Sequence, residues 1–304
     1  MTVRELQNEI LRLKKERGVF ILAHSYERHE ILEIADVTGD SYRLATAVKG
    51  AKEDTVLMCG VRFMAETVKI LAPEKRVILS EKDAGCPMAD ELTPELLGDL
   101  QKKYPNAVTA AYINTTARVK AMSDVCVTSS SAVKVLSRLP EKEILFVPDC
   151  NLGSYCAKSL PEKTFHFFDG GCPVHKQTGL SDVLRAKEEH PNALILVHPE
   201  CLKEVTDKAD YIGSTSGIMD FAKKSSCKEF IIGTENTIVE HLQYECPDKK
   251  FYPLSKKLIC EDMRLTTLKS VYDCLLGGGE EIILDEPLRL AAKKCIDKMI
   301  ELGG

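Results

Sequence analysis

The chain alternates between short apolar runs and longer segments in which apolar residues recur three and four positions apart. The runs are rich in Val, Ile and Leu and predict buried strands, whereas the segments between them predict amphipathic helices. The eleven predicted strands are VFILAH (19–24), TVLMCG (55–60), RVILSE (76–81), AVTAAYIN (107–114), DVCVTS (124–129), EILFVPD (143–149), TFHFFDG (164–170), ALILVHP (193–199), DYIGST (210–215), EFIIGT (229–234) and KFYPLS (250–255). This alternation favours an α/β fold with parallel sheets and crossover helices.

Three of the predicted strands align in one register. VFILAHSY, AVTAAYIN and ALILVHPE place His24, Tyr112 and His198 at equivalent positions, at intervals of 88 and 86 residues. Self-similarity at a fixed interval indicates a repeated structural unit. The sequence therefore predicts three copies of one α/β unit.

A cysteine motif follows nearly the same interval. Asp-x-Gly-Cys-Pro occurs at Cys86 and again at Cys172, 86 residues later, and a further 88 residues lead to Cys260 in LICEDM. Because two independent markers agree, we predict three pseudo-symmetric βαβ-type lobes with short parallel sheets around a central site. Their predicted boundaries are 1–88, 89–174 and 175–304, and the last range includes C-terminal closing helices.

Polar side chains stand at the exits of the three aligned strands. They are His24 with Tyr26, Tyr112 with Asn114, and His198 with Glu200. In open parallel sheets ligands bind beyond the carboxyl ends of the strands, so we expect these side chains to line a common site. A single histidine after a strand is more often a packed side chain, but six polar groups in register favour chemistry.

A further strand in each unit ends in a turn that precedes a helix. The turns are CVTSSSA (126–132), YIGSTSG (211–217) and, in the first unit, LMCGVRFM (57–64). Ser129, Ser214 and Thr215 supply hydroxyls at helix N-termini, a combination suited to binding an anion. The first turn departs from this pattern, and TGDSYRLA (38–45) offers Ser41 before a helical stretch instead.

The composition is that of an ordinary globular protein. Of 304 residues, 44% are apolar and 29% are charged, and the net charge of −5 with scattered Lys and Arg argues against a nucleic-acid partner. No run approaches about 18 uncharged apolar residues, so we expect no membrane span. MTVRELQNEILRLKKERG at the N-terminus has helical spacing and lacks the apolar stretch of a signal peptide, which predicts a cytoplasmic protein.

Twelve cysteines are a high number for this length. In a reducing cytoplasm structural disulfides are rare, so metal binding or thiolate chemistry becomes the question. Cys86, Cys172 and Cys260 share the repeat interval, whereas we interpret the other nine as small buried hydrophobic residues. Three widely spaced thiolates suit a [4Fe-4S] cluster with one iron free for a substrate oxygen. Spacing alone leaves two alternatives open, a zinc site and simple core cysteines.

Ten motifs, in order along nearly the whole chain, resemble those of the quinolinate synthase family. They are AHSYE (23–27), GDS (39–41), CGVRFMAET (59–67), AGCPMAD (84–90), YINTTARVKA (112–121), VTSSSAVKV (127–135), GGCPVH (170–175), VHPEC (197–201), GSTSG (213–217) and CEDMRLTTL (260–268). One tripeptide would carry little weight, but ten ordered motifs are specific.

The resemblance implies a triplicated αβα fold whose lobes meet over an oxygen-sensitive [4Fe-4S] cluster. It implies an enzyme that condenses iminoaspartate with dihydroxyacetone phosphate, releasing phosphate and two waters, to give quinolinate for NAD biosynthesis. The open iron would act as a Lewis acid. A transient contact with the enzyme that produces the unstable iminoaspartate would fit this role.

Transferred residue by residue, the resemblance also assigns roles. The implied cluster ligands are Cys86, Cys172 and Cys260. The implied catalytic residues are Tyr26, Tyr112, His198 and Glu200, of which Tyr26 and Glu200 would transfer protons. The implied substrate-binding residues are His24, Ser41, Tyr112, Asn114, Ser129, His175, His198, Glu200, Ser214 and Thr215.

The chain departs from the family pattern at Ser25, Glu27, Arg62 and Ser131, which affects fine positioning rather than the reaction. Two other functions stay open: another [4Fe-4S] hydro-lyase acting on a small hydroxy acid, and a non-enzymatic iron–sulfur sensor. A sensor needs a partner-binding surface such as a basic face or an added domain, and the sequence has neither.

Overall fold

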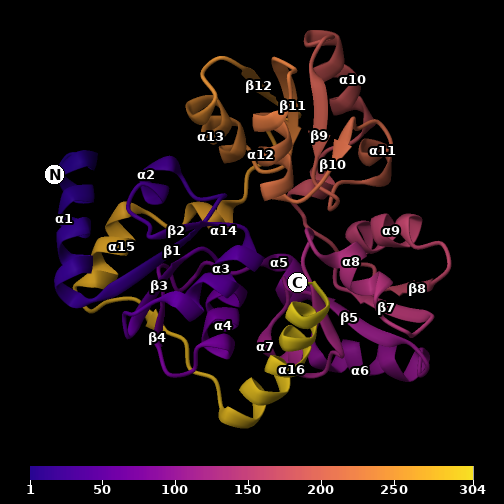
Figure 1. The fold of residues 1–304 in the computed structure, drawn as a ribbon, viewed down its shortest axis with the longest axis horizontal. Helices are drawn as coiled ribbons and strands as arrows, with labels where there is room; N and C mark the ends of the chain where they lie inside the picture. Colours follow the sequence, from indigo (N-terminus) through magenta and orange to yellow (C-terminus); the bar gives the residue numbers. More distant parts are fainter. Residues whose placement is uncertain (304) are drawn as a thin grey trace.

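Three separate β-sheets, each with helices packed around it, make up the protein (Figure 1). The computed structural model describes residues 1–303. In order across each sheet, the parallel strands are β4 (Arg76–Leu79), β3 (Thr55–Cys59), β1 (Val19–His24) and β2 (Val37–Gly39) in the first; β8 (Thr164–Phe167), β7 (Glu143–Val147), β5 (Val108–Tyr112) and β6 (Val125–Val127) in the second; and β12 (Lys250–Pro253), β11 (Glu229–Gly233), β9 (Leu194–Val197) and β10 (Tyr211–Ile212) in the third. The predicted α/β class with three αβα units is confirmed.

Helices occupy equivalent places in the three units: one precedes the first strand, and one follows each of the four strands. They are α1 (Val3–Arg17), α2 (His29–Leu32), α3 (Ser41–Ala47) with the 3₁₀ helix η1 (Val48–Gly50), α4 (Arg62–Leu71) and α5 (Pro87–Glu91) in the first unit; α6 (Pro94–Lys103), α7 (Ala117–Ala121), α8 (Ala132–Ser137), α9 (Cys150–Ser159) and the 3₁₀ helix η2 (His175–Gln177) in the second; and α10 (Leu180–Glu189), α11 (Lys203–Thr206), α12 (Thr215–Lys224), α13 (Thr237–Glu245) and α14 (Glu261–Arg264) in the third. Each of the eleven predicted strand ranges contains a strand.

The same side-chain contacts recur inside each of the three units. An aspartate before the second strand accepts the backbone amide of a residue in the first strand: Asp36 from Ile21, Asp124 from Thr109 and Asp210 from Ile195. A buried lysine before the fourth strand donates to backbone carbonyls: Lys75, Lys163 and Lys249. These contacts give all three sheets the same internal geometry.

One expected correspondence is wrong. LMCGVRFM (57–64) is not the first-unit counterpart of the turns after β6 and β10, because it forms the end of β3 and the start of α4. The counterpart is the short strand β2, which pairs with β1 as β6 pairs with β5 and β10 with β9. VTG is too short to read as an apolar run, so the pattern missed it. Since β2 leads to Ser41, that residue is the counterpart of Ser129 and Thr215.

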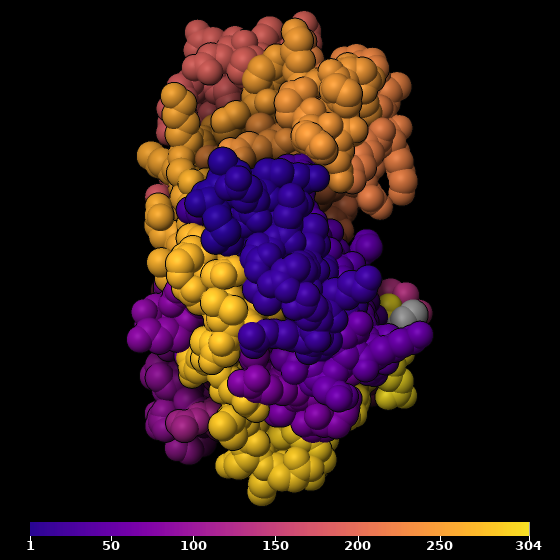
Figure 2. All heavy atoms as spheres, turned by 90° about the vertical axis from the view of Figure 1, so that its left-hand side faces the viewer, coloured from indigo at the N-terminus to yellow at the C-terminus, as the bar shows by residue number. Residues whose placement is uncertain are grey.

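The C-terminal segment returns to the first two units. β13 (Glu280–Glu281) pairs antiparallel with β4 at the edge of the first sheet. α15 (Leu268–Leu275) packs on α1, and Figure 2 shows the indigo N-terminal segment against the yellow C-terminal one. α16 (Glu286–Gly303) packs against α7, α8 and β6 of the second unit and α4 of the first. The division of the chain at 88 and 174 stays a prediction.

The first strand of each unit leads to a buried polar side chain, His24 at the end of β1, Tyr112 at the end of β5 and, just after β9, His198. The carboxyl ends of all three sheets face one space in the middle of the molecule. Polar groups at these ends therefore converge. None of the described helices combines the length and the apolar character needed to cross a membrane.

Candidate active site

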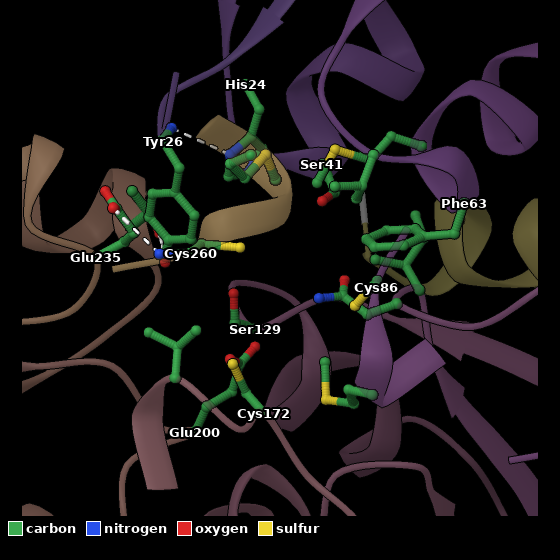
Figure 3. A pocket seen from close by; sticks show the side chains of 18 of the residues that line it. His24, Tyr26, Ser41, Phe63, Cys86, Ser129, Cys172, Glu200, Glu235 and Cys260 are labelled. Carbon is green, nitrogen blue, oxygen red and sulfur yellow. Dashed lines mark hydrogen bonds between the residues drawn. The ribbon is translucent and has the colours of Figure 1, made fainter. Parts of the chain in front are cut away.

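A cavity lies between the carboxyl ends of the three sheets (Figure 3). The predicted site residues that line it are His24, Tyr26, Ser41, Cys86, Tyr112, Asn114, Ser129, Cys172, His175, His198, Glu200, Thr215 and Cys260. Ser214 is not among the described lining residues: its Oγ accepts the amide of Gly217 at 3.2 Å and caps α12. The structure thus brings together all predicted site residues except one.

The three cysteines of the repeat occupy equivalent positions after the fourth strand. Cys86 and Cys260 are the N-cap residues of α5 and α14, and Cys172 precedes η2. All three cysteines line the central cavity. In Figure 3 the three side chains point into the same cavity. The fold therefore builds one thiol position three times and directs all three inward.

These thiols ionise poorly unless a cation joins them. Burial is the main cause that raises the pKa of Cys86 and of Cys260 to about 12 and the pKa of Cys172 well above its ordinary value. Iron ions would offset this cost, because cysteine thiolates are the usual ligands of iron–sulfur clusters. Donor atoms of Cys172, His175 and Glu200 also lie within 4.8 Å of one another. The residues present fit a metal cluster held by three cysteines.

A continuous chain of polar contacts joins the predicted catalytic residues. The Tyr26 hydroxyl lies 2.7 Å from Thr234 Oγ1, which lies 3.0 Å from His175 Nε2. His175 Nδ1 lies 2.9 Å from Glu200 Oε2, and the Tyr112 hydroxyl donates to Glu200 Oε1 at 2.6 Å. One path suitable for protons therefore connects Tyr26 to Glu200.

With Glu200 ionised, the donors in this chain all point in one direction. Thr215 donates to the Tyr26 oxygen at 2.9 Å, so the Tyr26 hydroxyl is free to donate to Thr234. Thr234 then donates to His175 Nε2, and His175 carries its proton on Nδ1, facing Glu200. The proton on His175 Nδ1 thus lies at ion-pair distance from Glu200, although the two groups are not aligned for a hydrogen bond.

The surroundings shift the pKa of the Glu200 carboxylate and the pKa of the two phenols in opposite directions. Burial, followed by the charge of Glu200, raises the pKa of both Tyr26 and Tyr112 well above 10. Burial also acts to raise the pKa of Glu200, but the nearby His198 and His175 and the hydrogen bond from Tyr112 outweigh it and lower that pKa. At neutral pH the site therefore offers an ionised proton acceptor beside protonated donors.

His24 and His198 share one environment and one tautomer. His24 Nδ1 accepts the backbone amide of Tyr26 at 3.1 Å, and His198 Nδ1 accepts that of Glu200 at 3.3 Å. Burial lowers the pKa of each imidazole to about 4. Both rings are thus neutral at pH 7 and carry their proton on Nε2, so each acts as an N–H donor rather than a cation.

The cavity has polar donors but no permanent cation. None of the described lining residues is Lys or Arg. Ser41, Ser129 and Thr215 supply hydroxyls at equivalent positions, and Ser41 and Thr215 begin α3 and α12. Asn114 adds an amide whose buried Oδ1 has no partner among the described groups. Anions would be bound here by hydroxyls, imidazole N–H groups and backbone amides.

Sequence reasoning missed three buried residues next to this site. Thr234 links Tyr26 to His175, and its counterparts in the other units are glycine and proline, so the repeat gave no signal for it. Asp149 and Glu235 stand 86 residues apart at the exits of β7 and β11. A search for carboxylates at the repeat interval could have found that pair.

Comparison with known proteins identifies the family. The profile of the family described as quinolinate synthetase A protein matches residues 8–301. The chain belongs to the quinolinate synthase family. Curated relatives with the name quinolinate synthase include proteins of Clostridium perfringens, 48% identical over 300 residues (99% of this chain, 100% of the relative), Caldicellulosiruptor bescii, 48% over 303 residues (100% of both), and Geobacter metallireducens, 46% over 297 residues (98% of this chain, 97% of the relative). The resemblance of the ten motifs, and with it the prediction of an enzyme that makes quinolinate, is confirmed.

Proposed function

We propose that this member of the quinolinate synthase family condenses iminoaspartate with dihydroxyacetone phosphate in the central cavity, with a [4Fe-4S] cluster bound by Cys86, Cys172 and Cys260. The observation that carries the proposal is the convergence of three equivalent thiols on a cavity that also contains an ionised carboxylate and two phenols. When bound, the cluster would supply a Lewis acid, because three protein ligands leave one iron without a protein ligand.

Substrate binding would use the neutral donors of the cavity. Iminoaspartate carries two carboxylates and dihydroxyacetone phosphate carries a phosphate, so both are anions. The hydroxyls of Ser41, Ser129 and Thr215 and the Nε2–H groups of His24 and His198 are the donors available to them. Neutral donors at helix starts bind anions without the strong retention that a buried lysine would give to a charged product.

Proton transfer would use the two ends of the polar chain. Glu200 is ionised and Tyr26 is protonated at neutral pH, so Glu200 is placed to accept a proton and Tyr26 to donate one. Release of two waters and ring formation require several such transfers, and a side chain within hydrogen-bond reach speeds each of them. Thr234 and His175 would relay protons between Glu200 and Tyr26.

The proposal also covers the cellular compartment of the enzyme and a protein partner. All twelve cysteines are free thiols, which is typical of a reducing compartment, and we infer that the enzyme acts in the cytoplasm. Because imines hydrolyse in water, a transient contact with the enzyme that produces iminoaspartate would limit that loss.

The test is anaerobic purification followed by iron analysis and a quinolinate assay. We expect about four irons per chain and quinolinate formation only when both iminoaspartate and dihydroxyacetone phosphate are present. Serine at Cys86, Cys172 or Cys260 should abolish both the cluster and the activity, whereas Cys227→Ser, outside the cavity, should change neither. Full cluster retention in any of the first three variants would refute the ligand assignment, and turnover without the triose would indicate a hydro-lyase.

A further inference from the structure

Each cysteine loop is joined to the third strand of its own unit by a backbone contact. The residue three positions beyond that strand donates its amide to the carbonyl two residues before the cysteine. The pairs are Arg62 to Ala84 at 2.9 Å, Cys150 to Gly170 at 3.1 Å and Asn236 to Leu258 at 2.8 Å. Since this contact involves no side chain, it sets the general path of the loop in all three units.

The second unit adds a buried carboxylate to this arrangement. Asp149 Oδ2 accepts the backbone amide of Cys172 itself at 3.1 Å, while Oδ1 accepts that of Leu152 at 2.8 Å at the start of α9. Asp149 is fully buried. A Cβ at Gly171 would lie 3.2 Å from Asp149 Oδ2 and 2.7 Å from Lys176 Cε, so the loop passes the carboxylate where a side chain would be crowded.

In the third unit a buried glutamate takes the place of the aspartate. Glu235 Oε1 accepts the backbone amide of Cys260 at 3.4 Å, marked by a dashed line in Figure 3, and Oε2 accepts that of Thr237 at 2.8 Å. Glu235 is buried, and its nearest cation is Arg264, 3.8 Å from Oε1. The contact with the cysteine is the same as in the second unit but longer.

The first unit has no carboxylate at the equivalent position. Val61 occupies the position equivalent to Asp149 and Glu235, at the same intervals of 88 and 86 residues, and a valine side chain accepts no hydrogen bond. The loop of Cys86 is held by backbone contacts and by the Arg62 side chain, which donates to the carbonyl of Lys82, instead of by a buried carboxylate. The surroundings of the three cysteines therefore differ chemically, although the fold around them is repeated.

We infer that Asp149 and Glu235 are positioning residues that fix the backbone of Cys172 and Cys260 before the cluster binds. The inference rests on the proposed cluster. Groups that orient metal ligands without touching the metal commonly change metal affinity by about ten- to hundredfold. Because the contact of Asp149 is shorter, its loss should have the larger effect.

The experiment compares cluster retention in anaerobically reconstituted wild type, Asp149→Ala, Asp149→Asn and Glu235→Ala. Release of iron to 2,2′-bipyridyl gives the rate of cluster loss, and the EPR spectrum of the reduced protein reports the surroundings of the iron. We expect loss about ten- to hundredfold faster in Asp149→Ala, a smaller acceleration in Glu235→Ala, and an altered EPR spectrum in both. Asp149→Asn keeps an acceptor for α9 and should fold, with intermediate retention.

Asp182→Asn is the matched control. Asp182 is also buried and accepts a backbone amide, that of Gly179 at 3.1 Å, but it lies at the start of α10 outside the cavity. Wild-type retention in the Asp149 and Glu235 variants would overturn the inference. So would equally fast loss in Asp182→Asn at a matched drop in the unfolding temperature of the cluster-free protein. A wild type without iron would refute the proposed cluster, and this inference with it.

Discussion

The Tyr112 hydroxyl donates a 2.6 Å hydrogen bond to Glu200 Oε1 and so joins the end of β5 to the end of β9. Tyr112→Phe would remove a donor that lowers the pKa of Glu200, and that pKa should rise. Loss of one hydrogen bond to a charged group should lower kcat about ten- to hundredfold.

Tyr104→Phe is the control for this change. Tyr104 stacks on His166 with ring centroids 3.9 Å apart and does not line the cavity among the described residues. Its hydroxyl can therefore be removed without touching Glu200. A Tyr112→Phe enzyme with the kcat of the wild type in steady-state kinetics would show that the hydrogen bond to Glu200 does not serve the reaction.

Thr234 is the link between Tyr26 and His175, and its removal should interrupt proton return without removing either end. In Thr234→Val the shape of the side chain is kept while the hydroxyl is lost, so we expect kcat to fall about tenfold with unchanged iron content. Thr234→Ser restores the hydroxyl and should recover most of the rate. Equal rates in the valine and serine variants would exclude a relay through this residue.

Most of the fold could be predicted from the sequence because the inner strands of each sheet are apolar and largely buried. β1, β3 and β7 bury nearly every side chain, which gives continuous Val, Ile and Leu runs. β2 was missed because three residues with one glycine carry too little apolar signal. β13 was missed as well, since Glu280 and Glu281 pair at a sheet edge, where exposure removes the need for apolar residues.

The site could be predicted only as far as the repeat reaches. His24, Tyr112 and His198 are visible because equivalent strand ends share a register. The contacts between units are not periodic, so nothing in the sequence indicated that Thr234 meets Tyr26. Lys120 is a stronger example: in ARVKAMS it reads as an exposed helix lysine, yet it is fully buried.

Lys120 gives a prediction that separates stability from binding. Its ammonium donates to the carbonyl of Ile113 at 2.8 Å and to that of Thr115, on either side of Asn114. Lys120→Met would leave two buried carbonyls without a donor and should lower the free energy of unfolding by about 2–4 kcal/mol. Because Asn114 lines the cavity, we also expect a higher KM. Urea unfolding and steady-state kinetics measure the two effects.

Lys163→Met is the matched control for that experiment. Lys163 also donates to two carbonyls, those of Leu139 and Glu141, each at 2.7 Å, and it is buried. It does not belong to the described lining of the cavity. We expect a comparable loss of stability with an unchanged KM. If both variants raised KM equally, the effect of Lys120 would reflect general loosening rather than the placement of Asn114.

The buried neutral histidines predict how cluster-free protein responds to acid. Burial lowers the pKa of His24 from 6.5 to about 4 in the folded state. Between pH 6.5 and pH 4 the unfolded chain therefore binds a proton at His24 that the folded chain does not, so stability falls as the pH falls through this range. His24→Gln removes this titration. The loss of unfolding free energy between pH 7 and pH 4 should be about 3 kcal/mol smaller than in the wild type.

Urea unfolding at a series of pH values measures that difference without reference to the absolute stability of the variant. Only the slope against pH matters, so any loss of packing in His24→Gln drops out. His198→Gln should behave in the same way, because burial also lowers the pKa of His198 to about 4. Parallel curves for wild type and variants would mean that folding leaves the pKa of both imidazoles at its unfolded value and would contradict the prediction.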